Sequence, residues 1–593
     1  MRVWVAGFEP WSRELAARRG TSSSGNGVQA LLEFGEREKW GGVRTGEGRQ
    51  RGCWNAVAAQ RGLSEHRWGS LSIQNLRSPT DTHRFAQNFA TLDLVTKQLA
   101  AMDASSSWVM LAGAVTFLAV VVASLSMLLS GSSGKKKTKP LPPGSFGVPL
   151  IGQTLSLLRA LRANAGEDWL RHWVTTYGPV SRLSFFGCPT AILIGPSGNK
   201  FVFSSGAITP KATESMARMI GRRTIRDVAG DEHRRVRAMM VQFLRPDACR
   251  RHVAGMDAEV RRHLDAEWRG RGTVAVMPAM KDLTFDVMCT VLFSLGRDDG
   301  ENEAVRRVLS AEFQQLVKGI SVVPLNLPFT SFNKCLAASR RGRHAVAGVI
   351  NERRAKLERG ENSAVNDVVT HMIAEGLPEE EIIDNVMFLI IAAHDTTAAL
   401  LTFLIRYLEA NREAYDKVLH EQEEVARCKA PEEALSWEDL SKMRYTWAAA
   451  LETLRLVPPV FSVLRKTTDD IEFGGYRIPK GWQMIQPMST TQWDPTIFPD
   501  PGRFDPARFE DTSAVPPFCF IPFGGGPRVC PGNEFARVET LVAVHYIVTR
   551  YRWKLNPGCD GSYARFPLPY PSQGLLIDIE PMHHRQALKQ SNA

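Results

Sequence analysis

The sequence has few cysteines for its length, and no two of them stand in a Cys-x-x-Cys spacing. Its 593 residues contain nine cysteines, scattered along the chain. A disulfide-stapled secreted domain needs a dense set of cysteines and a zinc ribbon or finger needs paired ones, so both classes are excluded. No internal repeat stands out. With 44% hydrophobic and 23% charged residues, the composition is that of a globular protein and not of a disordered or collagen-like chain.

The length and the charge leave several classes open. At about 100 to 200 residues per domain, the length allows three or four domains or one large enzyme fold. The net charge of +11 suggests an anionic partner, which could be nucleic acid, a membrane surface or an acidic protein. Composition alone does not choose among these three.

Charge is absent from one long apolar run, residues 108–129. As a helix this run would be about 33 Å long, enough to cross a bilayer. A buried core helix is the alternative, although such a helix is rarely apolar on every face over this length. Lysines crowd the residues just after the run and only Asp103 is charged just before it, so the positive-inside rule places the C-terminal bulk in the cytosol.

The first 101 residues are rich in Gly, Ser and Arg and show no sustained apolar periodicity. A transit peptide is one interpretation, but such peptides are poor in acids and this segment holds several glutamates. Met102 stands just before the apolar run, and we expect the functional protein to start there. The sequence thus predicts a disordered or mis-annotated extension at 1–101, a transmembrane signal anchor at 102–130, a basic and Pro-rich linker at 131–146 and a large domain at 147–593.

Within this domain, amphipathic stretches broken by Gly and Pro predict a mainly α fold with a small β region. The run 471–485 predicts a hairpin, with Gly474 and Gly475 as its turn. Glu452 and Arg455 share one face of a predicted helix and, taken alone, would form a surface ion pair. Ser436, followed by an acid three residues later, indicates a helix start.

The strongest local signal is the run FGGGPRVCPG at 523–532. Its glycines and prolines predict a tight loop in which backbone amides approach the sulfur of Cys530. A helix is predicted just after it, and a cysteine at a helix N-terminus has its thiolate favoured, so the loop suits an anionic sulfur ligand. A phosphate loop would need a Lys after the glycines, and a zinc site would need more ligands than Cys519. A buried structural cysteine stays open.

A second signal lies in the run 385–405, which is apolar nearly all round and therefore predicts a buried core helix. In its middle stand His394, Asp395, Thr396 and Thr397. A second transmembrane span is the rival, but an aspartate at the bilayer centre costs about 3 kcal/mol. An acid beside a hydroxyl suits a buried proton relay. The alternative, a hydroxyl that bonds back to the preceding turn, is expected of Thr397 more than of Thr396.

Together these motifs resemble those of the cytochrome P450 monooxygenases. The cysteine run matches FxxGxRxCxG, residues 452–455 match ExxR, residues 506–509 read PARF and residues 392–396 read AAHDT. Each motif alone is weak to moderate, whereas four in this order behind an anchor and a Pro-rich hinge are very specific. The resemblance covers residues 102–593 and implies the cytochrome P450 fold for the catalytic domain at 147–593, behind a single N-terminal transmembrane anchor helix.

The resemblance also implies a cofactor, haem b, with Cys530 as the thiolate ligand of its iron. The resemblance implies further haem contacts. His233 stands where the family often has Trp, and Arg465, after the ExxR helix, resembles a further propionate contact of the family. The implied cofactor-binding residues are Cys530, Arg528, His233, Arg237, Arg465 and Phe523.

Other matched residues receive structural or catalytic roles. Glu452 and Arg455, with Arg508 of PARF, would form a buried triad on the proximal side, in place of the surface pair. Thr396 would be the distal alcohol, and Asp395 its acidic neighbour in proton delivery. The family often has Gly where this chain has Ala393, and the added methyl could narrow the distal pocket.

The implied activity is insertion of one oxygen atom from O2 into a C–H bond, with electrons from NADPH through a membrane-bound NADPH–cytochrome P450 reductase. The motifs look like those of the plant clan of triterpenoid, brassinosteroid, gibberellin and abscisic acid oxidases, and most like the triterpenoid branch. We therefore expect a bulky apolar isoprenoid as the substrate. The expected pocket residues are Leu389, Ala392, Ala393, Val460, Phe461, Leu464, Leu568 and Tyr570.

Two other functions stay open at this point. An isomerase or dehydratase of the same fold would need no reductase, but such enzymes tend to lack the distal Thr, so Thr396 argues against it. A non-catalytic membrane haem protein would not need the pair of Asp395 and Thr396. The expected location is the endoplasmic reticulum membrane, single-pass and with the catalytic domain in the cytosol, so that the lipid bilayer is a partner and nucleic acid is not.

Overall fold

The computed structural model describes residues 115, 118, 139–148, 152–297, 299–320, 322, 324–360, 367–430, 432–565 and 568–582. The predicted extension at 1–101, nearly all of the predicted anchor at 102–130 and the first half of the predicted linker lie outside the described residues, and these parts stay predictions. The elements whose bounds the structure gives all belong to the compact unit Gly134–Ala593.

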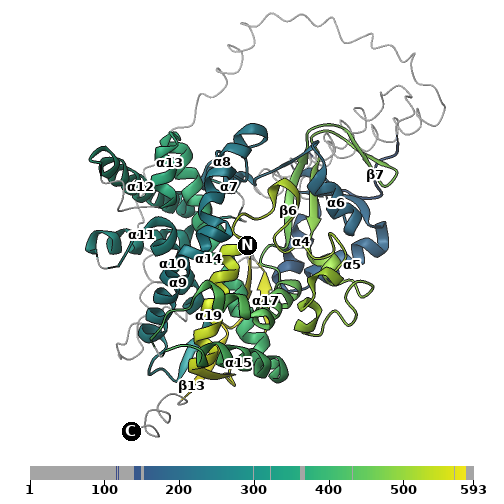
Figure 1. The fold of residues 1–593 in the computed structure, drawn as a ribbon. Helices are drawn as coiled ribbons and strands as arrows, with labels where there is room; N and C mark the ends of the chain where they lie inside the picture. The colour runs from purple at the N-terminus through teal and green to yellow at the C-terminus, as the bar shows by residue number, and fades with distance from the viewer. Residues whose placement is uncertain are drawn as a thin grey trace, which may run out of the picture. The chain divides into compact units, whose positions relative to one another are not determined.

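Helices dominate this unit (Figure 1). The longer ones are α5 (Gly166–Tyr177), α8 (Gly230–Leu244), α9 (Pro246–Glu267), α10 (Val276–Phe293), α11 (Gly300–Val317), α12 (Ser331–Glu358), α14 (Glu379–Ala410), α15 (Arg412–Arg427), α17 (Arg444–Leu456) and α19 (Asn533–Arg550). The shorter ones are α4 (Thr154–Arg162), α6 (Pro196–Ser204), α7 (Glu214–Ile220), α13 (Val368–Ala374), α16 (Trp437–Lys442) and α18 (Ser489–Gln492), with 3-10 turns η1 (Pro506–Phe509), η2 (Thr512–Ala514) and η3 (Gly526–Arg528).

The strands form one larger sheet and three small ones. In spatial order the larger sheet holds β1 (Gly144–Ser145), β2 (Val180–Phe185), β3 (Cys188–Leu193), β9 (Gln483–Pro487), β6 (Ser462–Thr467) and β4 (Ile208–Pro210). The small sheets are β10 (Tyr551–Leu555) with β13 (Leu576–Pro581) and β5 (Thr273–Ala275), β11 (Tyr563–Arg565) with β12 (Pro569–Pro571), and β7 (Ile471–Phe473) with β8 (Tyr476–Ile478). Figure 1 shows the larger sheet, with α4, α5 and α6, beside the helical majority. The predicted mainly α fold with a small β region is confirmed.

The predicted hairpin is confirmed in its first half. Strands β7 and β8 pair antiparallel, and Gly474 and Gly475 between them have φ of 59° and 84°. Two successive left-handed residues are what a tight two-residue hairpin turn requires, and glycine adopts them without strain. The second half of the run leaves the hairpin, because β9 instead pairs with β3 and β6 in the larger sheet.

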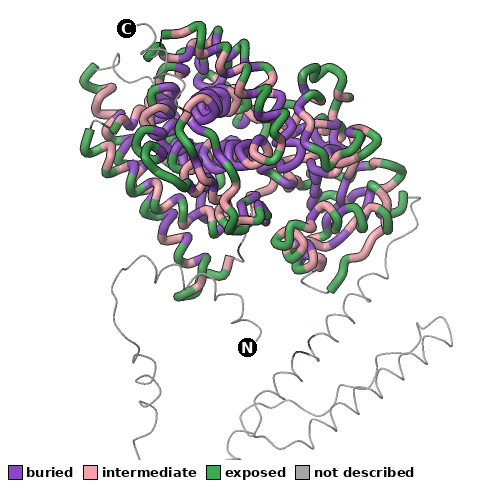
Figure 2. The backbone as a smooth tube through the Cα atoms, turned by 90° about the horizontal axis from the view of Figure 1, so that it is seen from below, coloured by how far each residue is buried: buried purple, intermediate pink, exposed green. Residues whose placement is uncertain are grey.

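The core is organised around α14, a helix of 32 residues that packs against α10, α12, α17 and α19. Its first turn holds Glu379, Glu380 and Glu381, which complement the positive end of the helix dipole. Among the described residues this helix alone is long and apolar enough to cross a membrane, yet 78% of its most apolar window is buried inside the protein. Figure 2 shows such buried residues gathered through the middle of the helices. The helix is therefore a core helix, as predicted.

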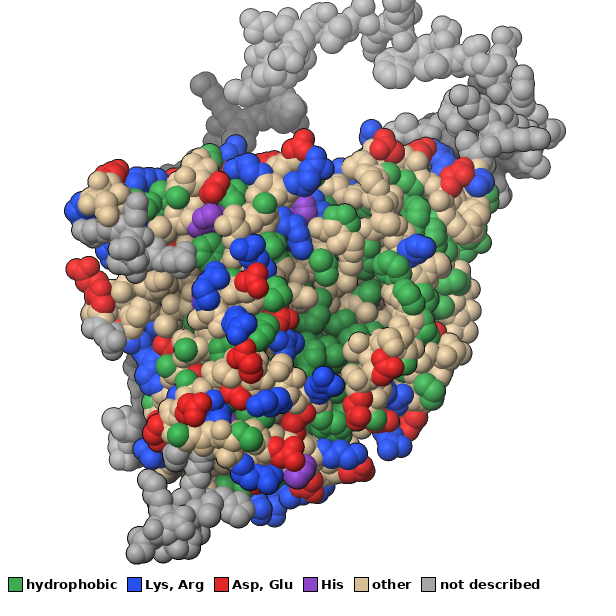
Figure 3. All heavy atoms as spheres, in the orientation of Figure 1, with side chains coloured by type: hydrophobic (Ala, Val, Ile, Leu, Met, Phe, Trp, Pro, Cys, Tyr) green, Lys and Arg blue, Asp and Glu red, His purple; other side chains and the backbone are tan. Residues whose placement is uncertain are grey.

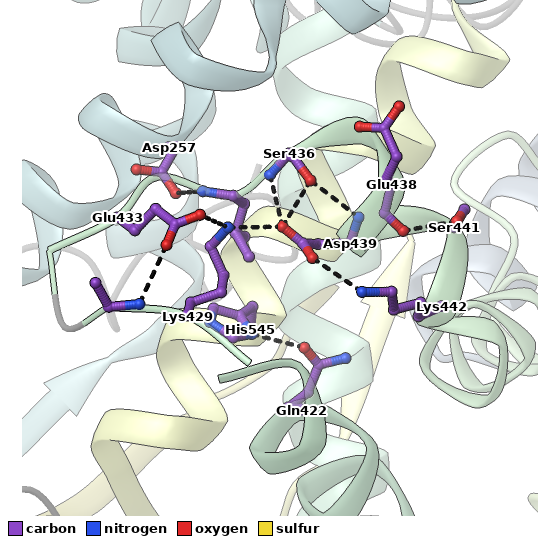
Figure 4. Close-up of polar contacts among 12 residues, drawn as sticks. Asp257, Gln422, Lys429, Glu433, Ser436, Glu438, Asp439, Ser441, Lys442 and His545 are labelled. Atoms are coloured by element: carbon purple, nitrogen blue, oxygen red, sulfur yellow. Dashed lines mark hydrogen bonds and ion pairs between the residues drawn. The ribbon is translucent and has the colours of Figure 1, made fainter. Parts of the chain in front are cut away.

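A polar cluster holds the turn between α15 and α16 (Figure 4). The Ser436 side chain accepts a hydrogen bond from the Asp439 amide, and the Asp439 carboxylate accepts one from the Ser436 amide, so the predicted helix start is a full capping box. Lys429 lies 2.8 Å from the Asp439 carboxylate, and both side chains are only 7% exposed. Burial by itself would raise the pKa of Asp439, but Lys429 and Ser436 lower it below its ordinary value.

We expect the substitution Lys429→Met to destabilise the protein, because it removes the buried cation of the Asp439 carboxylate and leaves only the exposed Lys442, at 3.3 Å. The free energy of unfolding should fall by about 2–3 kcal/mol at neutral pH, as measured by chemical denaturation. The difference should shrink below about pH 4, where an ordinary Asp protonates in the unfolded chain. Lys417→Met is the control, because the pair of Lys417 and Glu413 is exposed and solvent weakens its contribution to stability. Equal losses in the two variants would contradict this account.

Candidate active site

Cys530 lies in a tight loop that ends where α19 begins, and we call residues 523–532 the Cys loop. The Cys530 amide donates to the Phe523 carbonyl at 2.8 Å, which closes the loop on itself. Gly526 has a φ of +64°, and a Cβ at this position would lie 2.4 Å from the carbonyl oxygen of Phe203 in α6. Glycine is therefore required here on two grounds, the left-handed backbone and the close approach of α6.

The thiol of Cys530 is deep in the protein but not sealed off, since the residue keeps an intermediate exposure. Burial raises the pKa of this thiol above its ordinary value, while a hydrogen bond from the Gly532 amide and the charge of Arg237 lower it. The loop by itself thus favours the protonated thiol, contrary to the expectation from the helix start. A bound metal ion reverses this balance, because a coordinating thiol loses its proton to the metal. Among the described residues, no group of three or more acidic, His or Cys side chains could hold a metal.

One face of α14 is less buried than the rest of the helix. From residue 381 to residue 405 every residue is buried except Phe388, Ala392, Ala393 and Thr396. These four are spaced three to four residues apart or adjacent, so they lie on one side of the helix. We call this less buried side of the helix the distal stripe, and it is the side of α14 on which a ligand could lie. Figure 3 shows the surface hollowed in its middle, with hydrophobic side chains at the bottom.

Three arginines from separate parts of the chain gather near Cys530. The charge of Arg237 in α8 lowers the pKa of the Cys530 thiol and also that of Arg528 in the Cys loop. The charge of Arg528 in turn lowers the pKa of Arg465 in β6. Burial first, and then Arg528, lower the pKa of Arg465 to about 10. In the part of the chain that is described, neither Arg237 nor Arg465 has a carboxylate partner. Half-buried cations without a carboxylate partner fit an anionic ligand.

His233 and Arg528 have more specific surroundings. Burial, with Arg528 and Arg237 nearby, lowers the pKa of His233 to about 4, so the imidazole is neutral at physiological pH. Arg528 donates to three carbonyls, those of Ile225, Arg226 and Val228. Its guanidinium is therefore already positioned by backbone, with two nitrogens used, when it meets an anion.

A buried ion pair is formed by residues that precede the Cys loop along the chain. Glu452 and Arg455 are both 0% exposed and lie 2.7 Å apart. Arg508 comes within 3.5 Å of the same carboxylate, and Arg455 also donates to the Gln492 carbonyl at 2.8 Å. The interpretation as a surface pair is thus wrong, and the three side chains of the implied triad are in contact. Burial raises the pKa of Glu452, against the opposing effect of Arg455.

The two adjacent threonines of α14, Thr396 and Thr397, have the reverse of their expected contacts. The Thr396 hydroxyl donates to the Ala392 carbonyl at 2.6 Å, which is the back-bond expected of Thr397. Thr397 is buried and lies next to Glu539 of α19. The reason is the position of each residue on the helix. Thr396 lies on the distal stripe, where no other described side chain is hydrogen-bonded to it, and its hydroxyl therefore bonds its own backbone. Ala393, also on the stripe, leaves α14 continuous.

Asp395 and His394 face α10 and not the distal stripe. The Asp395 carboxylate lies 2.6 Å from Lys281 of α10, with side-chain exposures of 2% and 32%. His394 is hydrogen-bonded to Thr284 of α10 at 3.0 Å, and burial lowers its pKa to about 4. Sequence reasoning missed Lys281, because no motif surrounds it and it lies far from Asp395 along the chain.

The expected pocket residues fall into two groups. Leu389 and Phe461 are buried, Ala392 and Ala393 lie on the distal stripe, and Leu464 and Leu568 are half-buried. Val460 and Tyr570 are 38% and 41% exposed. In β12, Tyr570 stands between two buried prolines and so occupies the outer face of its strand. A pocket role for any of them stays a prediction. Phe523 packs against the main core.

Comparisons with known proteins agree with this geometry. A family model described as "Cytochrome P450" matches residues 142–565. A beta-amyrin 28-monooxygenase of Barbarea vulgaris is 38% identical over 473 residues, or 78% of this chain and 98% of the relative. A beta-amyrin 16-beta-monooxygenase of Platycodon grandiflorus is 37% identical, with 78% and 98% covered. Cyanobacterial CYP120A1 with bound retinoic acid aligns with a TM-score of 0.66 at 28% identity, covering 75% of this chain and 100% of that one.

We expect Gly526→Ala to deprive the purified protein of haem. The new methyl would meet the Phe203 carbonyl and force a left-handed residue to carry a Cβ, at a cost of about 1–2 kcal/mol for the backbone alone. Haem content per protein and thermal stability measure the effect. The neighbour Gly525→Ala is the matched control, because its φ is −162° and its Cβ would meet only the side chain of Phe203, at 3.2 Å. Equal haem content in the two variants would show that the close approach at Gly526 is unimportant.

Proposed function

The chain belongs to the cytochrome P450 family and is a monooxygenase, and we propose that it inserts one oxygen atom from O2 into a C–H bond of a bulky apolar isoprenoid, triterpenoid or sterol-like. The observation that carries the proposal is the distal stripe, the less buried and mainly apolar face of the core helix α14, which carries a single hydroxyl and lies in the same unit as Cys530. The relatives support the substrate class, because two of them are named for oxidation of beta-amyrin and another is a taxane 13-alpha-hydroxylase of Taxus cuspidata.

The residues fit the cofactor that the family implies. We propose haem b, with Cys530 as its iron ligand and with Arg237, Arg465 and Arg528 as the cations for its propionates. When bound, haem supplies the activation of O2 and the oxidation of the C–H bond, and the thiolate favours O–O cleavage. The arginines suit propionates because they are half-buried and, for Arg237 and Arg465, unpaired with any described carboxylate. His233 and Phe523 would complete the binding site.

The polar residues of α14 can hold and pass a proton. Asp395 is buried and joined to the partly exposed Lys281, so it forms the inner end of a polar link from solvent to α14. Thr396 already donates to the Ala392 carbonyl, which leaves its oxygen free to accept a hydrogen bond from a group in the cavity. Thr396 would therefore steady a donor at the reacting atom, while Asp395, which faces α10, would hold protons on the other side of the helix and take part in their delivery from there.

Electrons would come from NADPH through a membrane-bound NADPH–cytochrome P450 reductase, and the net positive charge of the chain suits an acidic partner. Exposed apolar residues near the start of the described chain support contact with a bilayer of the endoplasmic reticulum, the cytosolic domain at 147–593 being tethered by the anchor at 102–130. These residues are Leu141 (37% exposed), Phe146 (40%), Val148 (62%) and Leu155 (59%).

Turnover with labelled oxygen tests the proposed reaction. The full-length enzyme is combined with a plant reductase and NADPH in lipid discs and supplied with beta-amyrin, a plant sterol or a taxane-type diterpene under 18O2. We expect one of these isoprenoids to yield a product that carries one 18O atom, detected by mass spectrometry. Turnover of a fatty acid such as laurate, with none of the isoprenoids oxidised, would refute the substrate class.

Thr396→Ala should separate electron use from product formation. Without the hydroxyl, we expect product per NADPH to fall by about 10²-fold while NADPH oxidation continues and hydrogen peroxide is released. Thr402→Ala is the matched control, because the Thr402 hydroxyl makes the same back-bond, to the Ala398 carbonyl at 2.7 Å, but is buried off the distal stripe. Unchanged coupling in Thr396→Ala would remove this residue from the mechanism.

A further inference from the structure

The segment between α7 and α8, residues 221–229, is fastened to the first turns of α14, and we call it the α7–α8 loop. The Asp384 carboxylate accepts a hydrogen bond from the Arg223 amide at 3.0 Å. The Asn385 side chain accepts from the Ile225 amide at 2.8 Å and donates to the Arg223 carbonyl at 2.9 Å. Two adjacent side chains of α14 therefore make hydrogen bonds to three backbone groups of the loop.

The contact is close, and both α14 side chains that make it are buried. Asp384 is 5% exposed and Asn385 is 0% exposed. Gly221 has a φ of +113°, and a Cβ there would lie 2.0 Å from a carboxylate oxygen of Asp384. Arg343 of α12 donates to Oδ1 of Asp384 at 2.7 Å, while the Arg223 amide bonds Oδ2, and Arg343 also donates to the Ile220 carbonyl at 2.9 Å. The carboxylate is thus held from behind, and only glycine permits the loop to approach it.

The opposite side of the α7–α8 loop is held by the Cys loop. Arg528, two residues before Cys530, donates to the carbonyls of residues 225, 226 and 228. The side chain of Arg226 lies over the ring of Phe388, 5.6 Å from its centroid. Because Phe388 is the first residue of the distal stripe, the loop contacts both that stripe and the Cys loop.

We propose that Asp384 and Asn385 are positioning residues that hold the α7–α8 loop as a fixed wall of the active site and thereby set how the substrate is presented to the distal stripe. The proposal rests on the proposed function for the identity of the substrate. The clamp, by which we mean the hydrogen bonds of Asp384 and Asn385 to the α7–α8 loop, is made by protein groups alone and does not depend on the proposed function. A rigid apolar substrate offers few polar handles, so its orientation depends on walls that do not move.

Hydrogen exchange on the substrate-free holoenzyme tests the clamp. In Asn385→Ala the amide and carbonyl of the loop lose their partners, and we expect the amides of residues 223–228 to exchange about tenfold faster or more, since each hydrogen bond is worth about a fivefold factor in local opening. Gln422→Ala is the control, because Gln422 is equally buried and bonds Thr446 and His545, far along the chain from the loop (Figure 4). It should leave exchange in the loop unchanged.

A catalytic readout separates positioning from stability. In Asn385→Ala we expect the KM for the isoprenoid substrate to rise at least fivefold, with a smaller change in kcat. We also expect the distribution of product isomers to become broader. Gln422→Ala should change none of these quantities. Where Asn385→Ala does not retain haem, Gly221→Ala disturbs the same contact from the loop side and should give the same two results. Wild-type exchange in the loop of a haem-loaded variant would overturn the proposal, and so would faster exchange with unaltered KM and product ratio. Failure of every isoprenoid to react would count against the substrate class alone, since the exchange result needs no substrate.

Discussion

The interaction on which the rest of the site depends is the fully buried pair of Glu452 and Arg455. Two charges removed from water carry a large desolvation penalty, and only complete satisfaction of their hydrogen bonds offsets it. Here Arg455 binds the carbonyls of Gln492 and Arg503, and Glu452 accepts from the Asp505 amide. The pair therefore fixes the chain that runs from α18 to η1 against α17, and this is the chain that leads into the Cys loop.

From this fixed frame, two tight contacts define the space for a cofactor. On one side, Gly526 lets the Cys loop approach α6, so that the position of Cys530 follows from backbone packing. On the other side, α14 is buried along its length except for the distal stripe. The arginines between them come from α8, β6 and the Cys loop, and their mutual repulsion favours an anion in their midst. A cytochrome P450 active site thus arises from packing that leaves one face of one helix unfilled.

Much of this was predictable where the chemistry is local in sequence. The Cys loop, the Gly474–Gly475 turn and the capping box at Ser436 each depend on a few neighbouring residues, and each is present in the structure. Contacts between distant segments were not predictable. No sequence motif near Lys281 predicts its pairing with Asp395. Which of Thr396 and Thr397 lies on the distal stripe depends on the rotation of α14 in the core. The burial of Glu452 followed only from the family resemblance, because an i, i+3 pair looks the same on a surface.

Binding of haem by Cys530 is most directly tested by the carbon monoxide difference spectrum of the reduced full-length protein and of Cys530→Ala. A thiolate ligand shifts the main absorption band of the carbon monoxide complex strongly to the red. We expect this red-shifted band in the wild-type protein and its complete loss in Cys530→Ala. A folded, haem-loaded wild type without the red shift, or a red-shifted band that persists in Cys530→Ala, would contradict the assignment of Cys530 and with it the site described around it.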